Sequence, residues 1–343
     1  MKTAEHYSVI IIGGGPAGVG AAVGLSKRGI KSILILERGD KLGGIPSLYK
    51  KKKGGIRTFI RWSRGGLPVF GEDYAKWLES QISKRNIEYR LQSQVIEIEP
   101  KKKSVTVVNP GEGKNKLTSD VIIMACGSRE KTSSERGFMM GSRPMRVFFT
   151  KQLLELIDKH DLLPMRNPVI IGSDLIAYAA AAKLKKAGAE EAIIVDKEDK
   201  PKCSFFERLY FRRWSNPVYH GLNALESVTV IGSGAVTGIK LSNGEFIKCD
   251  GIAICGELIP NSELALVGNL KVNLPSRKPE IGPGYQLSEP GWFAAGNILG
   301  GFHGAEWCYF NGQRVGRSAF GYLSKSLKAD RNTKSAKREY LRI

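Results

Sequence analysis

The first forty residues alternate apolar runs with a glycine-rich turn and a segment of small and apolar residues. Residues 8–12 and 32–37 are almost continuously apolar, and residues 17–28 repeat Ala, Val and Leu at helical spacing. Short continuous apolar runs are typical of strands that are covered on both faces, as in parallel sheets. The pattern predicts a strand, a helix and a second strand, and it assigns the chain to the α/β class.

The alternation of strand and helix patterns continues and includes a predicted antiparallel insertion. Residues 73–85 have an apolar stripe at helical spacing, and residues 95–98 and 105–108 alternate apolar with polar side chains. These patterns predict a helix and then a small antiparallel insertion, after which residues 121–125 form another buried strand. Residues 128–144 show no periodic pattern, so we expect an irregular crossover there.

The second half repeats the alternation and ends in a basic segment. The patterns predict helices at about 150–160 and 305–323, a strand–helix–strand unit from Val169, strands near 228–231, 236–241 and 252–255, and a strand running into a turn at 292–297. The last twenty residues have little apolar content, and we expect them to be disordered.

The turn between the first strand and the first helix has the sequence GGGPAG at 13–18, which is the G-x-G-x-x-G spacing of a dinucleotide-binding unit. In such a turn Gly13 permits the tight bend, Gly15 lets the backbone approach a pyrophosphate, and Gly18 lets the helix pack closely on the strand. The helix N-terminus attracts phosphate. Glu37 follows Gly13 by 24 residues, at the end of the second strand, where a carboxylate binds a ribose.

A second turn runs in step with the first, because GSDLIA at 172–177 leads to Asp196 at the same offset of 24 residues. It predicts a second nucleotide site made by Gly172, Ser173, Asp174 and Asp196, and Asp196 suits the free 2′-hydroxyl of NAD. Asp174, however, stands where the pattern has its middle glycine. A like charge at about 4–5 Å from a pyrophosphate costs a few kcal/mol at an effective protein dielectric. Two interpretations stay open: NAD(H) binding, and a retained Rossmann scaffold whose site is weak or vacant.

Composition is that of an ordinary soluble protein. The 343 residues are 42% hydrophobic and 25% charged, enough for two domains with separate cores. The apolar run at 9–12 is too short for a signal peptide or a membrane span, so we expect a cytoplasmic protein without a transmembrane segment. The five cysteines, at 126, 203, 249, 255 and 308, include no CxxC pair, which fits a reducing compartment, and we expect no metal site.

The formal charge is +20, from 53 Lys and Arg against 33 Asp and Glu, and it is concentrated at 50–53, at 101–103 and in the tail from about 325. Basic surfaces attract acidic proteins, nucleotides and anionic lipids. No nucleic-acid motif accompanies the charge, so we expect no nucleic-acid partner. Peripheral contact of the tail with an anionic surface and a merely solvated terminus both stay open.

Three further segments resemble the FAD side of the glutathione- and thioredoxin-reductase-like flavoproteins. They are LGG at 42–44, VIIMACG at 121–127 and FAAGN at 293–297, and together with the first turn they extend in order over nearly the whole chain. In that superfamily, the FAD-dependent pyridine nucleotide-disulfide oxidoreductases, the glycine pair lies beside the flavin ribityl and pyrophosphate. The resemblance implies FAD as the cofactor and NAD(H) as a candidate second nucleotide.

The motif and the resemblance together define an expected FAD site. Its residues are Gly13, Gly15, Pro16, Ala17, Gly18, Glu37, Arg38, Gly43, Gly44, Val95, Ala125, Cys126, Gly127, Gly296, Asn297 and Ala305. Asn297 stands where the family has an aspartate, so a hydrogen bond can be kept while the charge is lost. The resemblance also implies two Rossmann-like (FAD/NAD(P)-binding) domains, the second inserted into the first. We expect the FAD domain at 1–147 and 258–343, the NAD(P)-binding-like domain at 148–257, and a basic tail at about 325–343.

Within the superfamily the chain is similar to a branch without a redox dithiol, the flavoprotein subunits of opine and amine oxidases, hydrogen cyanide synthase and dye-linked proline dehydrogenase. LGGIP at 42–46, GELIPN at 256–261 and FAAGNI at 293–298 carry this resemblance. It implies electron transfer between a small substrate or NAD(P)H and a protein partner, either an acidic protein or a second dehydrogenase subunit. A self-contained NAD(P)H-dependent reductase, a flavin monooxygenase and a non-catalytic FAD-binding scaffold stay open as alternatives.

Two candidate catalytic residues follow the turn at 296–297. His303 and Glu306 lie at the start of the helix that should face the flavin, and either could carry a proton. In the structural alternative, His303 caps the helix and Glu306 complements its dipole.

Overall fold

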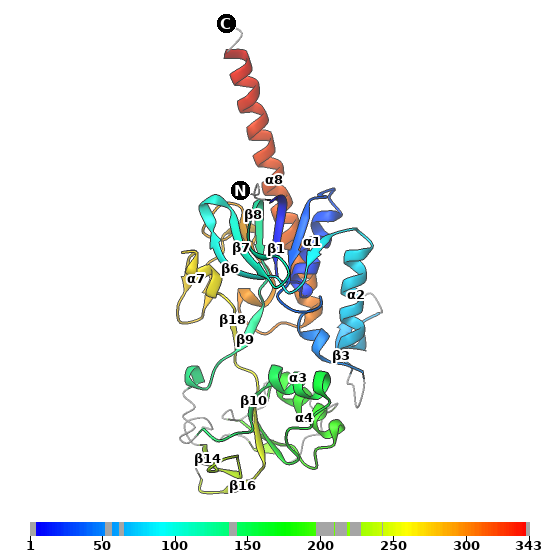
Figure 1. Cartoon of the computed structure of the whole chain (residues 1–343), viewed down its shortest axis with the longest axis vertical. Coiled ribbons are helices and arrows are strands. Elements are labelled where there is room, and N and C mark those ends of the chain that lie inside the picture. The colour runs from blue at the N-terminus through cyan, green and yellow to red at the C-terminus, as the bar shows by residue number, and fades with distance from the viewer. Residues whose placement is uncertain are drawn as a thin grey trace.

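The computed structural model describes residues 5–51, 57–61, 65–136, 143–196, 209, 218–219, 228–241 and 243–340. The chain folds into two α/β lobes, and a long C-terminal helix projects from the upper lobe in Figure 1. Each lobe has its own sheet, mixed in the upper lobe and parallel in the lower. The predicted fold class, α/β with two Rossmann-like units, is confirmed.

The sheet of the upper lobe has the strand order β5-β2-β1-β8-β7-β6, with β21 alongside β8. Its strands are β1 (Glu5–Ile12), β2 (Ile33–Leu36), β5 (Glu88–Arg90), β6 (Gln94–Glu99), β7 (Ser104–Asn109), β8 (Gly113–Met124) and β21 (Trp292–Ala294). Parallel ladders place Ile10 level with Leu34 and Ile122. Strands β6, β7 and β8 pair antiparallel, which confirms the predicted insertion.

Three helices cover one face of this sheet and pack on apolar residues such as Val9 and Ile11. They are α1 (Pro16–Ser26), α2 (Gly71–Ser83) and α8 (Ala305–Tyr340). The other face of the parallel strands shares an apolar core with residues of β6, β7 and the short helix α7 (Glu263–Val267). Helices α1 and α8 lie very close, because a Cβ added at Gly312 would be only 2.9 Å from the carbonyl carbon of Ala17.

The last helix is longer than the sequence analysis predicted. Helix α8 continues to Tyr340, so the expected end at 323 and the expected disorder of the tail are both wrong as far as that residue. The physical reason is that residues 322–340 contain neither glycine nor proline, and nothing else in them stops a helix. The last three residues of the expected tail, 341–343, lie outside the described residues.

The lower lobe has a parallel sheet of order β10-β17-β11-β12-β13. Its elements are β10 (Val147–Phe149), α3 (Thr150–His160), β11 (Pro168–Ile171), α4 (Leu175–Ala187), β12 (Ile193–Val195), β13 (Val218–Tyr219) and β17 (Gly251–Ile254), with a small antiparallel sheet of β14 (Thr229–Ile231), β15 (Gly238–Lys240) and β16 (Phe246–Lys248). Helix α3 has the predicted bounds. It is joined to α4 by a buried ion pair, in which Lys183 Nζ lies 2.6 Å from Asp158 Oδ1.

Two short strands connect the lobes. In Figure 1, β9 (Ser128–Glu130) and β18 (Leu258–Pro260) run side by side between them, and they pair antiparallel. The irregular crossover expected at 128–144 is therefore wrong for β9. The proposed domain boundaries at 147 and 258 adjoin β10 and β18.

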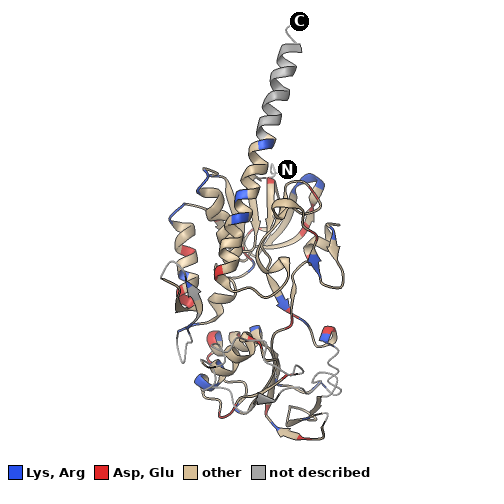
Figure 2. Cartoon of the chain, turned by 180° about the vertical axis from the view of Figure 1, so that it is seen from behind, with Lys and Arg blue, Asp and Glu red and all other residues tan. Residues whose placement is uncertain are grey.

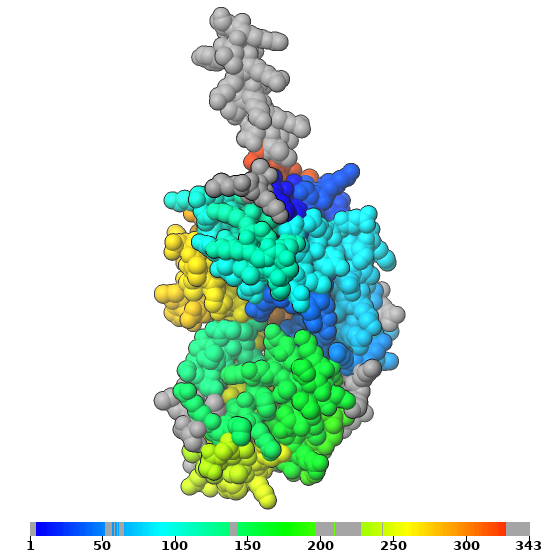
Figure 3. Space-filling model, viewed as in Figure 1, coloured from blue at the N-terminus to red at the C-terminus, as the bar shows by residue number. Residues whose placement is uncertain are grey.

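The lobes also touch through the loop that follows β2. Tyr49, next to η1 (Ile45–Leu48), is 7% exposed and belongs to the apolar core that contains Leu153 and Tyr178 of the lower lobe. Figure 3 shows that the surface is hollowed between the lobes on this face. The remaining short elements are β3 (Arg57–Arg61), β4 (Leu67–Phe70), η3 (Pro100–Lys102), η4 (Ser134–Arg136), β19 (Val272–Asn273), β20 (Lys278–Pro279), η6 (Pro283–Tyr285) and η7 (Gly296–Leu299).

Candidate functional site

The first glycine turn joins β1 to α1 and leaves no room for side chains on its inner side. Gly13 has a φ of +110°, and a Cβ added there would lie 3.0 Å from the carbonyl carbon of Ala125. At Gly18 an added Cβ would be 3.1 Å from the carbonyl carbon of Gly13 and would overlap its oxygen. Both positions require glycine, so α1 begins directly against the end of β1.

Gly15 differs from these two because the space beside it is open. The one atom within 4 Å of an added Cβ, chain neighbours aside, is the Cα of Gly44 at 3.8 Å. Gly15 is the N-cap of α1, and no side chain accepts a hydrogen bond from the first turn of the helix. Open space in front of an uncapped helix N-terminus is a phosphate cradle.

Glu37 follows β2 and turns its carboxylate toward this cradle. Its Oε2 accepts a hydrogen bond from the backbone N–H of Gly14 at 2.7 Å, and its Oε1 accepts one from Gly39 at 2.7 Å. Each carboxylate oxygen can accept a further bond. The two backbone bonds therefore orient the group without exhausting its capacity to accept ribose hydroxyls.

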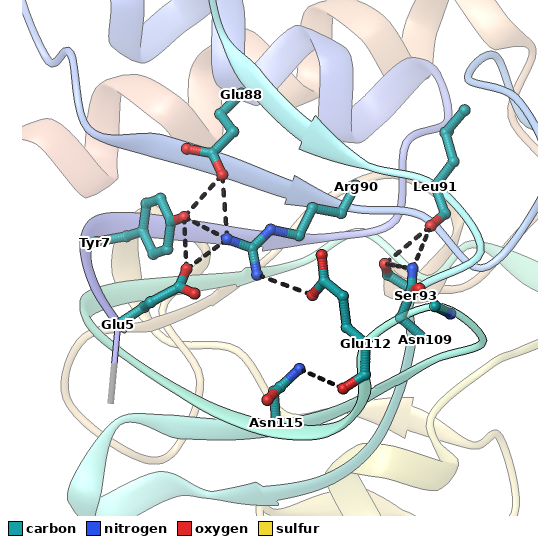
Figure 4. Close-up of polar contacts among 10 residues, drawn as sticks. Glu5, Tyr7, Glu88, Arg90, Leu91, Ser93, Asn109, Glu112 and Asn115 are labelled. Atoms are coloured by element: carbon teal, nitrogen blue, oxygen red, sulfur yellow. Dashed lines mark hydrogen bonds and ion pairs between the residues drawn. The ribbon is translucent and has the colours of Figure 1, made fainter. Parts of the chain in front are cut away.

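The strand beside β2 is held by a network around Arg90, drawn in Figure 4. The Arg90 guanidinium contacts the carboxylates of Glu5 and Glu88, and the Tyr7 hydroxyl donates to Glu88 at 2.8 Å. The carbonyl of Arg90 accepts a hydrogen bond from the backbone N–H of Glu37 at 2.9 Å. The network thus ties β1 to β5 and, through that backbone bond, helps to position Glu37.

The residues that follow β8 lie against Gly13 of the first turn. The N–H of Ala125 donates to the carbonyl of Ile12 at 2.8 Å, which holds the two strand ends together. Gly127 has a φ of +69°, and nothing lies within 4 Å of a Cβ added there, so the space beside this residue is open. Burial raises the pKa of the Cys126 thiol to about 12, so the thiol stays protonated and is a poor nucleophile.

The C-terminal turn is closed by two asparagines. Asn297 Oδ1 accepts from the N–H of His303 at 3.1 Å, and its Nδ2 donates to the carbonyl of the same residue at 3.1 Å. Asn311, on α8, accepts from the N–H of Gly296 at 2.8 Å, and its Nδ2 is buried with no hydrogen-bond partner among the described residues. A buried unpaired donor beside a glycine turn suits a bound polar group or an ordered water. Sequence analysis missed Asn311 because an asparagine inside a helix carries no pattern.

The two candidate catalytic residues have different surroundings. The ring of His303 is partly exposed and stacks on the ring of Trp307, with centroids 3.7 Å apart. Glu306 is 6% exposed, and its Oε2 accepts a hydrogen bond from the Tyr74 hydroxyl at 2.7 Å. His303 therefore offers a ring at the surface, whereas Glu306 is engaged in a buried contact with α2.

The second glycine turn joins β11 to α4 and is built differently in front of the helix. Asp174 occupies the position of Gly15, and its Oδ1 accepts a hydrogen bond from the backbone N–H of Ala177 at 3.0 Å. A Cβ added at Gly256, at the end of β17, would lie 2.9 Å from the Asp174 carboxyl carbon. The carboxylate therefore fills the space that is open in the first turn.

Two more carboxyl groups surround this turn. Asp196 is 5% exposed and accepts a hydrogen bond from the hydroxyl of Ser173. Burial raises the pKa of Asp174, and that of Glu130 to about 7. The buried guanidinium of Arg136 donates hydrogen bonds to the carbonyls of Cys255, at 3.2 Å, and Gly256, at 2.5 Å, which follow β17. The second turn therefore differs from the first in that the N-terminus of its helix is occupied by the chain's own carboxyl group.

A sequence profile of the pyridine nucleotide-disulphide oxidoreductases matches residues 7–314. The chain belongs to this family. The soluble pyridine nucleotide transhydrogenase of Pseudomonas paraeruginosa is 26% identical over 351 residues, covering 94% of this chain and 71% of the relative. The enzyme of that name from Hamiltonella defensa is 24% identical over 334 residues, covering 88% and 68%.

Solved structures with the same fold agree with this assignment. Thioredoxin reductase from T. acidophilum superposes with a TM-score of 0.72 at 20% identity, over 94% of this chain and 99% of the other. L-proline dehydrogenase from P. horikoshii gives 0.65 at 18% identity, over 96% and 60%. At these identities the likeness establishes the fold alone.

Membership of the family makes the protein an FAD-dependent oxidoreductase, and family members use NAD(P)H. The first turn fits FAD, because its cradle is open and uncapped. Of the other expected FAD contacts, Arg38 is exposed beside Glu37, and the side chain of Val95 is buried in the core. Cys203 lies outside the described residues.

No group of three or more His, Cys, Asp or Glu side chains in the part of the chain that the structure describes is arranged to hold a metal ion. None of the helices in the described ranges combines the length and the apolar character needed to cross a membrane.

Proposed function

We propose that the protein is the flavoprotein component of a multi-component dehydrogenase. In this proposal, FAD at the first turn takes electrons from a small substrate and passes them to a protein partner, and no NAD(P)H binds at the second turn. The observation that carries the proposal is the Asp174 carboxylate, which caps α4 in the place left open in front of α1.

The cap opposes a dinucleotide in two ways. It occupies the volume where a pyrophosphate would approach the helix, and it adds a charge of the same sign. A like charge at about 4–5 Å costs a few kcal/mol, which corresponds to a loss of affinity of about a hundredfold or more. Rotation of the side chain away from the helix would break the cap, at a cost of about 1 kcal/mol, and would leave a buried carboxylate to be accommodated elsewhere.

The residues of the first site have distinct roles in the proposal. Bound FAD supplies hydride acceptance and electron release. The N-terminus of α1 binds its pyrophosphate, Glu37 binds a ribose, and the start of α8 directs its positive dipole end toward the cofactor. His303 is the proposed proton carrier, because its ring is partly exposed and held by Trp307. Glu306, bonded to Tyr74, is proposed to fix α8 against α2.

The test is the absorption spectrum of the FAD-loaded protein under anaerobic conditions, before and after NADH and then after dithionite. The proposal predicts a yellow protein that keeps its oxidised spectrum with NADH and loses it with dithionite. Reduction by NADH would instead resemble the matched relatives, which are pyridine nucleotide transhydrogenases. Rapid bleaching by NADH would contradict the proposal and support a self-contained NAD(P)H-dependent reductase.

A second candidate, of another class, is a non-catalytic FAD-binding subunit. The engaged state of Glu306 favours it, since its buried carboxylate accepts a hydrogen bond from Tyr74. It predicts flavin that stays oxidised with every small substrate and is reduced once the co-purified partner is added. Reduction by a small substrate alone would exclude it.

A further inference from the structure

One side of α8 is exposed, and the flavin site does not account for its composition. Trp307, Phe310, Arg314, Arg317 and Lys325 are all exposed, and their spacing places them along one side of the helix. We call these five residues the α8 face. Trp307 and Phe310 are 40% and 43% exposed. The opposite side of the same helix is buried against α1 and the sheet.

The α8 face is positively charged. The one acid among residues 305–326 is Glu306, which is buried and accepts a hydrogen bond from the Tyr74 hydroxyl. Within the described ranges, no carboxylate pairs with Arg314 or Arg317. Figure 2 shows the basic bands that recur along this helix.

The aromatic end of the face is ordered and lies next to the candidate flavin site. Trp307 stacks on His303, whose backbone is bonded to Asn297 of the glycine turn. A fixed, exposed tryptophan beside arginines has the composition of an interface hot spot. Two neighbouring exposed aromatic side chains also form an apolar patch of the kind that marks interaction sites.

We propose that the α8 face is the docking surface for the electron-accepting partner, and that the partner presents an acidic patch with an apolar pocket for Trp307. This inference rests on the proposed function, which supplies the electrons. Charge complementarity selects an acidic protein, because the face has three cations and no anion. Each reduced flavin gives two electrons, one to each of two one-electron carriers, and the accompanying proton goes to solvent.

The experiment uses the FAD-loaded full chain, reduced photochemically and mixed with oxidised cytochrome b5, a small acidic haem protein. Haem absorbance should report a reaction whose rate rises with cytochrome concentration, approaches saturation and falls as salt is added. The Arg314→Glu/Arg317→Glu variant should lower the rate constant at least tenfold at low salt. Trp307→Ala should raise the concentration for half-saturation several-fold. The matched control, Lys240→Glu/Lys248→Glu, reverses two exposed charges on the lower lobe and should stay within twofold of the wild type.

Several results would overturn the inference. Equal losses in both double variants would mean that net charge, and not the α8 face, sets the rate. A dimer that becomes monomeric in the Arg314→Glu/Arg317→Glu variant would make the face a contact between copies. Co-sedimentation with phosphatidylserine vesicles, lost in that variant, would identify a membrane as the occupant. Failure of the proposed function gives a different signature, namely no bound flavin or bleaching by NADH, because photoreduction bypasses the electron donor.

Discussion

The two glycine-rich turns differ at one position that has the same backbone conformation in both. Gly15 has φ −77° and ψ −174°, and Asp174 has φ −81° and ψ 176°. Each residue follows a parallel strand and precedes a helix. In the first turn the helix N-terminus faces open space, whereas in the second it is bonded to its own carboxylate.

The difference shows that a Rossmann unit can keep its fold while its ligand position is filled from within. A helix N-terminus attracts an anion, and in the second turn the anion belongs to the protein. The surroundings match the cap, because Gly256 has no side chain to collide with the Asp174 carboxylate. Function at such a turn therefore depends on the side chain at the N-cap and not on the fold.

The largest expected effect concerns what holds the second unit together. Lys183 and Asp158 form an ion pair with 1% and 5% side-chain exposure, so Lys183→Met leaves a buried charge without its partner. We expect a loss of about 3–5 kcal/mol in unfolding free energy, measured by urea denaturation. The Asp158→Asn/Lys183→Met variant should recover most of it, and Lys151→Met, at an exposed lysine of α3, should change stability by less than about 0.5 kcal/mol. An equal loss in Lys151→Met would contradict the assignment to the buried pair.

The second prediction concerns a variant that places the aspartate N-cap of the second turn at the first turn. Gly15→Asp should fold, because the backbone conformation is already that of Asp174. Its carboxylate should occupy the cradle and weaken FAD binding about a hundredfold or more, measured by flavin fluorescence titration of the apoprotein. Gly15→Asn adds the same volume without the charge and should lose less. Undiminished FAD affinity in Gly15→Asp would show that the cap does not exclude a pyrophosphate.

The third prediction compares Glu37, which follows β2, with Asp196, which follows β12 in the other lobe. Glu37→Gln should weaken FAD binding about tenfold, because a carboxylate that accepts ribose hydroxyls is replaced by an amide. Asp196→Asn should leave FAD affinity unchanged, because Asp196 is buried in the other lobe and bonded to Ser173. Equal losses in the two variants, measured by the same titration, would contradict the separation of the two sites.

The smallest effect is a pH dependence that belongs to the second turn. Burial raises the pKa of Glu130 to about 7, above its ordinary value, so the folded protein binds a proton that the unfolded chain has released. Stability from this group is fully present below about pH 4.5 and is lost as pH rises through about 7. Urea denaturation at pH 5 and pH 8 should show a smaller difference in Glu130→Gln than in the wild type. A difference that is unchanged in Glu130→Gln would contradict the shift.

The fold could be predicted from the sequence wherever a pattern is local. The first strand–helix–strand unit, helix α3 and the antiparallel insertion each carry their signal within a dozen residues or so. Strand β9 could not be predicted, because its three residues have no periodicity and its partner, β18, lies far along the chain. The extension of α8 to Tyr340 was missed because low apolar content was interpreted as disorder.

The site was predictable to a similar depth. The glycine pattern indicates both turns, and Asp174 is the departure from it. An aspartate immediately before an apolar helical run is also an N-cap signal, but the sequence does not show that its carboxylate fills the space in front of the helix. The contacts of Glu306 with Tyr74 and of Asn311 with the glycine turn depend on tertiary packing, so no spacing in the sequence indicates them.

The most direct test of the account is calorimetric binding of NADH to the wild type and to Asp174→Gly, under anaerobic conditions. Glycine at an N-cap costs only a few tenths of a kcal/mol relative to aspartate, so the variant should fold. We predict no measurable binding by the wild type and binding at least about a hundredfold tighter by Asp174→Gly. Tight binding of NADH by the wild type, with no gain in the variant, would contradict the claim that Asp174 closes the second site.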